Sequence, residues 1–258
     1  MNKIAYNPRW LAGLALAVAL GMASCRSGYE VARVEGSRVA MDSTWDVHPS
    51  AEALALLAPY KAGVDSMMQQ VLGTSAMSMD RYRPESPLSN LVADVLRQAA
   101  TDVLGKPADM GLVNIGGIRN SLTQGPITMA TAYELLPFEN SLCVLTLKGD
   151  VLRQLFENIA GNMGEGVSGV RLQISRDGRL LDATIGGKPL DENRTYTVAT
   201  IDYLAEGNDG MRALPLAESR ICPPGATLRS LFIAYVERLE KSGQAVAARI
   251  EGRVTLKD

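Results

Sequence analysis

Apolar residues recur with a helical spacing in some segments of this chain and in short strand-length runs in others, and the two kinds of segment alternate. Between residues 170 and 198 the strand-like runs follow one another directly, separated only by the turn sequences RDGR and GGKP. Such turns predict β-hairpins, because a purely parallel sheet needs a long crossover between strands. We therefore expect an α/β fold in which helices pack on a mixed sheet, with residues 50–258 as one domain. The expected helices are 50–72, 87–104, 129–135, 150–160 and 227–241, and the expected strands are 111–114, 141–148, 170–175, 180–185, 196–201 and 253–256.

The first expected helix, 50–72, serves as a lead-in to the domain. Pro49 suits the start of a helix, and Gly73 suits its end. The apolar face of this helix consists of Leu57, Tyr60, Val64, Met67 and Val71, at spacings of three and four.

The N-terminus has the layout of a secretory signal. Lys3 and Arg9 supply positive charge, residues 10–23 are largely apolar, and the small residue Ser24 precedes Cys25. A cysteine in that place resembles a bacterial lipoprotein box, so we expect residues 1–24 to be removed and Cys25 to be lipidated, with 25–49 as a polar tether. The alternative is ordinary signal cleavage beside an incidental cysteine. We expect an exported lipoprotein, anchored in a membrane of a bacterial envelope on its periplasmic side or at the cell surface.

The composition of the chain limits the classes of molecule that it is expected to bind. The chain is 47% hydrophobic and 21% charged, and its net charge is −2, so it lacks the basic excess of nucleic-acid binders. We therefore expect no nucleic-acid partner. After the signal, the sequence contains no apolar stretch of the roughly 18 residues that a membrane span needs.

Two cysteines remain after Cys25, namely Cys143 and Cys222. An oxidising compartment permits a disulfide between them. Cys143 lies in the strand-like run SLCVLTL, where a buried thiol is common, so we favour two buried thiols over a disulfide.

A first group of candidate site residues follows the expected strand that ends at Asn114. Gly116 and Gly117 let the backbone approach a ligand closely, because they carry no Cβ. The guanidinium of Arg119 suits phosphate or carboxylate, and Phe138 lies in a Pro-Phe-Glu-Asn turn. The alternative is a glycine turn, a surface arginine and a core phenylalanine.

A second group lies in the sequence IDYLAEGNDGM, where Tyr203 precedes Asp209 and where Gly207 and Gly210 flank the acid. An aspartate in a glycine loop can accept two hydrogen bonds from a vicinal diol, as acids do on ribose. The alternative is a simple aspartate turn.

Several segments together resemble the C-terminal, nucleotide-binding domain of the 5'-nucleotidase family. They occur in the family's order and at similar spacings, and the resemblance runs from about residue 74 to 212. These segments are SNLVADVLRQAA, NIGGIR, YELLPFEN, LTLKGDVLRQLFE and YTVATIDYLAEGNDGM.

The resemblance implies a role for each matching residue. Phe138 and Tyr203 would clamp a nucleobase, where stacking contributes about 1–3 kcal/mol per base. Asp209 would hold the ribose diol, Arg119 would face the phosphate or ribose, and Asn114 would contact the base.

A further family arginine corresponds to Arg81 or Arg83, of which we take Arg83. The family loop Gly-Gly-Asp reads Gly-Asn-Asp here, and Asn208 tolerates the left-handed conformation well, so we expect the loop to keep its geometry.

The family's hydrolysis uses two metal ions in a separate N-terminal domain. Such a site needs several His, Asp and Asn ligands, and this sequence contains one histidine, His48. We therefore expect no cofactor in this chain, with divalent metals only in a partner subunit, and we expect His48 to be a surface or helix-start residue.

Three hypotheses follow. In the first, which we favour, the chain recognises nucleotides for a 5'-nucleotidase-type hydrolase in nucleotide catabolism, and a separate metallophosphatase subunit supplies catalysis. The helix at 50–72, which resembles the family's interdomain helix, agrees with such a division. The second is a stand-alone nucleotide- or nucleoside-binding lipoprotein without catalysis, and the third is a degenerate domain kept for structure or protein interaction.

Overall fold

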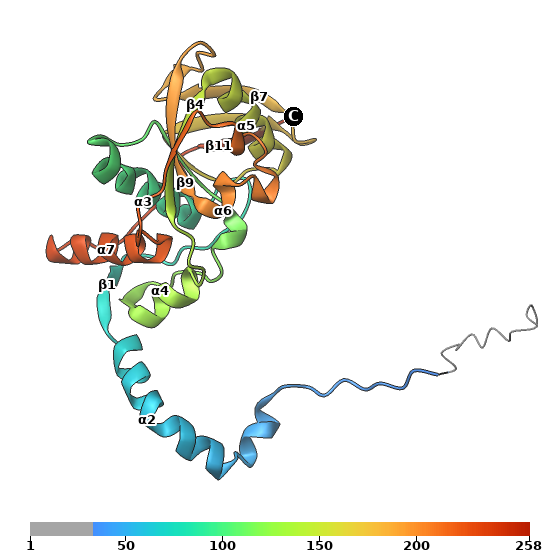
Figure 1. Ribbon diagram of the computed structural model, residues 1–258, viewed down its shortest axis with the longest axis vertical. Coiled ribbons are helices and arrows are strands. Elements are labelled where there is room, and N and C mark those ends of the chain that lie inside the picture. The colour runs from blue at the N-terminus through green and yellow to red at the C-terminus, as the bar shows by residue number, and fades with distance from the viewer. Residues whose placement is uncertain (1–32) are drawn as a thin grey trace, which may run out of the picture. The chain divides into compact units, whose positions relative to one another are not determined.

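The computed structural model describes residues 33–258 (Figure 1). The chain divides into two units, residues 1–54 and residues 55–258. The described part of the first unit has irregular backbone, a short 3-10 helix η1 (Ser43–Val47) and the first residues of α2 (Ala51–Met68). His48 follows η1 and is exposed. The expected signal sequence and the lipidation site Cys25 lie outside the described residues. Among the helices that are described, none combines the length and the apolar character that a membrane span requires.

The second unit is built around a five-stranded mixed sheet. Only β2 and β9 run parallel, and the other neighbours are antiparallel. Their order across the sheet is β10 (Ser219–Ile221), β4 (Leu142–Lys148), β9 (Thr195–Ile201), β2 (Met110–Val113) and β5 (Gly166–Ser168).

Two smaller sheets complete the unit. The expected hairpins form a four-stranded sheet, in which the C-terminal strand pairs parallel to β6; its order is β11 (Val254–Lys257), β6 (Val170–Ser175), β7 (Leu180–Ile185) and β8 (Lys188–Pro189). The third sheet pairs β1 (Val71–Ser75) with β3 (Gly125–Thr128) antiparallel. The expected α/β fold is confirmed, but with three sheets.

The helices pack on these sheets and close the core. The sequence explains the ends of α3 (Pro87–Leu104), because Ser86 and Ser89 form a capping box at its start and Gly105 takes a left-handed conformation at its end. This helix covers β2 and β5, while α5 (Gly149–Gly161) contacts strands of both larger sheets. The remaining helices are α4 (Met129–Leu135), α6 (Asp202–Ala205) and α7 (Leu228–Lys241), and α7 lies beside α3 and β1 (Figure 1).

The expected helix 50–72 is too long. It ends at Met68, and Gly73 belongs to β1 instead of closing the helix. A Cβ at Gly73 would lie 2.8 Å from the Val236 side chain, so this glycine allows β1 to approach α7 closely. None of the residues of α2 is buried, and its predicted apolar face, which includes Tyr60, is exposed.

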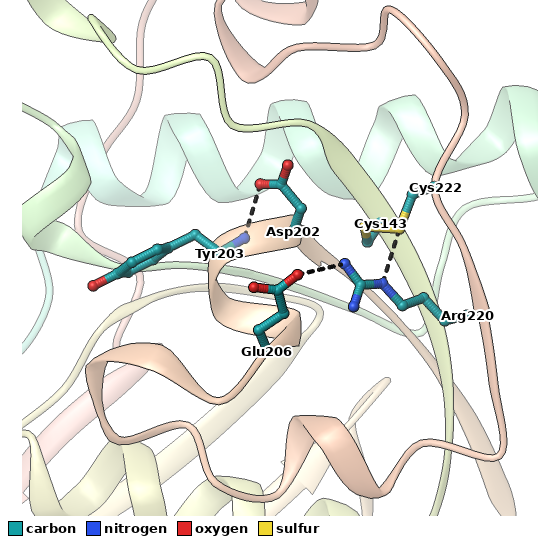
Figure 2. Close-up of a disulfide and its surroundings, with 6 residues drawn as sticks. All are labelled: Cys143, Asp202, Tyr203, Glu206, Arg220 and Cys222. Carbon is teal, nitrogen blue, oxygen red and sulfur yellow. Dashed lines mark hydrogen bonds and ion pairs between the residues drawn. A yellow bond between two sulfur atoms is a disulfide. The ribbon is translucent and has the colours of Figure 1, made fainter.

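The expectation of two free thiols is wrong, because Cys143 and Cys222 form a disulfide (Figure 2). Cys143 is buried in β4 as expected. The antiparallel pairing of β10 with β4 places Ile221 opposite Val144. Cys222, which follows Ile221, therefore lies opposite Cys143, which precedes Val144, and their Cα atoms are 4.2 Å apart. The three-residue strand β10 was not predicted, and without it nothing in the sequence brings the two cysteines together.

Candidate functional site

The candidate site residues follow strand ends that meet at one edge of the five-stranded sheet. β2 and β9 are parallel neighbours, so Asn114 after β2 and Tyr203 and Asp209 after β9 emerge at the same edge. β4 runs antiparallel to β9 and begins at this edge, which brings in Phe138 and Asn140. Ligands of open α/β sheets commonly bind outside the carboxyl ends of strands.

These residues enclose a pocket of about 360 Å³, which is within the usual range for small-molecule sites. Every predicted site residue except Arg83 lines it. Asn140 was missed, although it stands only two residues after Phe138 in the same turn. The lining consists of Asn114, Gly116, Gly117, Arg119, Phe138, Asn140, Tyr203 and Asp209.

The carboxylate of Asp209 is the centre of the pocket's polar side. Asn114 donates from Nδ2 to one carboxylate oxygen of Asp209 at 2.6 Å, and the Tyr203 hydroxyl donates to the other at 2.9 Å. The hydrogen bond from Tyr203 to Asp209, together with the negative charge of that carboxylate, raises the pKa of the Tyr203 hydroxyl. The hydroxyl therefore stays a donor at neutral pH.

The side chain of Asn114 also contains a hydrogen-bond acceptor, the amide oxygen Oδ1. Its Nδ2 must face the Asp209 carboxylate, so its Oδ1 points elsewhere, and this buried oxygen has no partner among the described residues. A buried acceptor without a donor is costly, and this oxygen lies against Gly117 instead of facing the open pocket.

The loop that carries Asp209 is shaped by left-handed backbone. Gly207, Asp209 and Gly210 have φ values of 87°, 51° and 78°. The left-handed non-glycine residue of the loop is thus Asp209 itself, whereas we expected Asn208 to use this conformation. Asn208 instead donates from its side chain to the backbone oxygen of Tyr203 at 2.8 Å, which ties the loop to α6.

Two aromatic rings line the pocket while remaining largely exposed: Phe138 is 47% and Tyr203 is 40% accessible. Phe138 is therefore not a core residue. Arg119 donates to the backbone oxygen of Gly116 at 3.2 Å, and its guanidinium lies 5.9 Å from the centre of the Phe138 ring. Exposed rings beside a cationic group offer stacking surfaces and a positive charge to an aromatic, anionic ligand.

The helix that carries Tyr203 is also linked to the disulfide strand. In Figure 2, Glu206 at the end of α6 reaches towards Arg220 on β10, with 3.7 Å between the charged groups, and Arg220 donates to the sulfur of Cys222 at 3.1 Å. Tyr203 leaves α6 on the side away from this pair. The disulfide thus secures the edge of the sheet next to α6.

Gly117 and Gly116 differ in their surroundings. A Cβ on Gly117 would lie 2.7 Å from Oδ1 of Asn114, whereas the nearest such atom to Gly116 is 4.0 Å away. Gly117 is therefore needed to accommodate the side chain of Asn114. We expected the glycines to make room for a ligand, but Gly117 makes room for the Asn114 amide.

Arg83 does not line the pocket. Its Nε donates to the backbone oxygen of Gly164 at 2.9 Å, and its Nη2 donates to the carboxylate of Glu165. A role for Arg83 in contact with a ligand thus remains a prediction.

A different cavity of about 220 Å³ lies beside α3, β5 and β6, and Arg97 and Arg171 are among its lining residues. Its central arginine, Arg253, pairs with Asp94 at 2.8 Å and with Glu251 at 3.0 Å. Arg97 and Arg171 donate to the backbone oxygens of Ala108 and Glu251, so the charged groups of this cavity are better described as a structural hydrogen-bond and ion-pair network.

The sequence matches the family described as "5'-nucleotidase, C-terminal domain" over residues 67–215. The chain belongs to this family. The match includes every predicted substrate-site residue, from Arg83 to Asp209.

Individual relatives of this 5'-nucleotidase C-terminal domain are much longer than the region they share with it. "Endonuclease YhcR" of Bacillus subtilis is 28% identical over 218 residues, which is 81% of this chain and 17% of that protein. "Cell wall protein Lmo0130" of Listeria monocytogenes is 28% identical over 243 residues, which is 83% of this chain and 30% of that protein. The crystal structure of a 5'-nucleotidase precursor from Thermus thermophilus matches with a TM-score of 0.69 and 30% identity, over 80% of this chain and 43% of the other.

The metal centre that the family resemblance implies does not fit the residues of this domain. Over residues 33–258, no three His, Cys, Asp or Glu side chains are grouped so that they could hold a metal ion. The only histidine of the sequence is His48, far along the chain from the pocket residues. We therefore derive no metal-dependent step from these residues.

Proposed function

We propose that the pocket binds a nucleotide or nucleoside, and that the chain recognises the substrate of a 5'-nucleotidase-type hydrolase in nucleotide catabolism. In this proposal, hydrolysis is carried out by a separate metallophosphatase subunit. Membership of the 5'-nucleotidase C-terminal domain family supports nucleotide binding as the general role. The composition of the pocket supports the details.

The observation that carries the proposal is the hydrogen bonding of Asp209. A carboxylate has about four acceptor positions, and Asn114 and Tyr203 use two of them, one on each oxygen. Each oxygen therefore keeps one position, which suits the two neighbouring hydroxyl groups of a ribose. The donors also hold the carboxylate in place before a ligand arrives, which lowers the entropic cost of binding.

The rest of the pocket suits the other parts of a nucleotide. Phe138 and Tyr203 expose ring faces on which a base can stack. Asn140 adds an amide with both donors and an acceptor. Arg119 can pair with a phosphate.

We propose a separate catalytic subunit because the sequence contains one histidine and because residues 33–258 hold no group of three His, Cys, Asp or Glu side chains suited to a metal ion. Binding energy from the base and ribose would then act on chemistry that another chain performs, as binding energy remote from a reacting group does in general.

Export and anchoring form part of the same proposal. We infer that the chain is exported and lipidated at Cys25, as the layout of residues 1–25 suggests. The disulfide between Cys143 and Cys222 supports an oxidising compartment outside the cytosol, and one relative is described as a cell wall protein.

The test is calorimetric titration of the full chain, purified in a mild detergent, with AMP, UMP and adenosine. We expect binding that Phe138→Ala and Asp209→Ala both weaken by about ten-fold or more, because the first removes a stacking surface and the second removes the ribose acceptor. Tyr60→Ala and Asp182→Ala, at exposed positions outside the pocket, are the matched controls. Absence of binding at millimolar ligand would refute a nucleotide-binding role for the isolated chain.

A further inference from the structure

A buried carboxylate lies behind the pocket wall without lining it. Glu165 is 1% exposed and immediately precedes β5. The pairing of β2 with β5 places Val113 opposite Gly166, so the next step of the register places Glu165 beside Asn114. The position of Glu165 is thus determined by the same strand pair that delivers Asn114 to the pocket.

All partners of Glu165 are hydrogen-bond donors. The backbone N–H of Ile115 donates to Oε2 at 2.7 Å, and Asn162 Nδ2 and Arg83 Nη2 donate to Oε1 at 3.1 Å and 2.5 Å. These donors come from three different segments: the turn after β2, the end of α5 and the loop before α3. Only an ionised carboxylate satisfies all of them, because a protonated acid or an amide would turn one acceptor into a donor.

Asn162 extends this network to the loop that carries Asp209. Its Nδ2 also donates to the backbone oxygen of Asp209 at 2.8 Å. Among the described residues, the only two non-glycine residues with a left-handed backbone are Met163 and Asp209. Asn162 directly precedes Met163 in the chain and is hydrogen-bonded to the backbone of Asp209. Such conformations cost free energy and persist where the surroundings hold them.

We propose that Glu165 is a positioning residue that holds the Asn114–Ile115 turn and, through Asn162, the Asp209 loop in the arrangement that binds the ligand. This inference rests on the proposed nucleotide-binding function of the pocket. It also gives Arg83 a role as the counterion of Glu165, at the rear of the site.

The proposal implies a dependence on pH. Burial raises the pKa of Glu165, while the Ile115 N–H and the charge of Arg83 act in the opposite direction without cancelling it. Two other charged groups belong to this network: Arg83 on the loop before α3, and Asp209, which is reached through Asn162. The remaining donors, the Ile115 N–H after β2 and the Asn162 amide after α5, are uncharged. The network is therefore intact at high pH and weakens as the pH falls through the raised pKa.

The experiment compares Glu165→Gln with Glu157→Gln, an identical change at an exposed position of α5. Calorimetric titration of the full chain with AMP at neutral pH should show binding weakened by about ten-fold for Glu165→Gln and unchanged for Glu157→Gln. As the pH is lowered from neutral into the acidic range, wild type should lose affinity by more than Glu165→Gln, since the variant has no carboxylate to protonate at this position. Wild-type affinity in Glu165→Gln, or identical pH profiles of the two proteins, would overturn the proposal.

A second variant and a ligand-free measurement separate this inference from the proposed function. Asn162→Ala removes the connection between Glu165 and Asp209, since Asn162 donates to both, but it leaves the hydrogen bond from the Ile115 N–H to Glu165. It should weaken binding similarly while the Ile115 amide keeps its NMR chemical shift. In Glu165→Gln without ligand, the amides of Ile115, Asp209 and Gly210 should all shift. If wild type binds no nucleotide, the proposed function fails, and these shifts alone decide: displaced Asp209 and Gly210 signals support the positioning role, and unchanged signals refute it.

Discussion

At the scale of single residues, the pocket is defined by groups that are held before a ligand binds. Asp209 receives hydrogen bonds from Asn114 and Tyr203, and Asn114 fits only because Gly117 has no side chain. The chemistry of the site therefore depends on contacts between these side chains, which a sequence motif does not describe. Two substitutions test this description.

The first is Asp209→Asn, which preserves the size of the side chain but replaces an acceptor oxygen with a donor that faces Asn114 or Tyr203. We expect AMP to bind roughly ten-fold more weakly or worse, because the diol loses one acceptor and the side chain loses its alignment. The measurement is calorimetry with AMP and with 2'-deoxy-AMP. Wild type should prefer the ribose and the variant should not; a preference of equal size in both proteins would exclude Asp209 as the diol acceptor.

The second is the pair Gly117→Ala and Gly116→Ala. The added methyl at Gly117 would meet Oδ1 of Asn114 at 2.7 Å, while the one at Gly116 has nothing closer than 4.0 Å. We expect Gly117→Ala to lower the free energy of unfolding by about 1–3 kcal/mol, as overpacking does, and Gly116→Ala to lower it clearly less. Denaturant unfolding of both variants is the measurement, and equal losses would contradict the role of Gly117 in making room for Asn114.

At the scale of secondary-structure elements, short strands decide how the parts of the site are held. β10 has three residues, yet its pairing with β4 aligns Cys143 with Cys222 and places Arg220 near α6. The exposed ion pair between Arg220 and Glu206 contributes little by itself. The disulfide is therefore the stronger of the two restraints on this edge.

Removal of the disulfide should destabilise the chain. It closes a loop between residues 79 apart in the sequence, for which the loss of unfolded-state entropy corresponds to about 4 kcal/mol. We expect the double variant Cys143→Ser/Cys222→Ser to have a free energy of unfolding lower by that amount, measured by equilibrium denaturant unfolding. Reductant should destabilise wild type to a similar degree and leave the double variant unaffected; a wild type insensitive to reductant would show that the bond is absent or unimportant.

At the scale of the whole molecule, the chain has a pocket suited to a nucleotide but a single histidine in its sequence. The region that matches this chain makes up only part of each relative, 17% of one and 30% of another. The proposed function assigns recognition to this chain and hydrolysis to a separate subunit.

The corresponding prediction concerns phosphate release. The chain alone, supplied with AMP and divalent metal ions, should release no phosphate above background, because its donor set does not suit a two-metal centre. Addition of the proposed metallophosphatase subunit should produce release that Asp209→Asn reduces. Phosphate release by the chain alone, retained after repeated purification, would contradict the division of labour.

Sequence reasoning located the long elements and most of the pocket, and it failed where pairing between distant segments decides the outcome. The helix α3 was predicted with its exact ends, because its caps are local. The strands β1, β3, β5 and β10 were missed, since each has three to five residues and too few positions for a periodic pattern. Glu165 was missed for a related reason: the side chains of its partners Arg83 and Asn162 come from separate segments, one of them 82 residues away.

The class of fold and the kinds of group available to the site follow from local features of the sequence, namely hydrophobic periodicity, turn residues and motif spacing. Tertiary structure alone decided which of these groups meet. The parallel pairing of β2 with β9 brings Asn114 to Asp209, the pairing of β2 with β5 brings Glu165 behind them, and the pairing of β10 with β4 joins the cysteines. Each pairing is chosen by the packing of the whole core, which no single segment encodes.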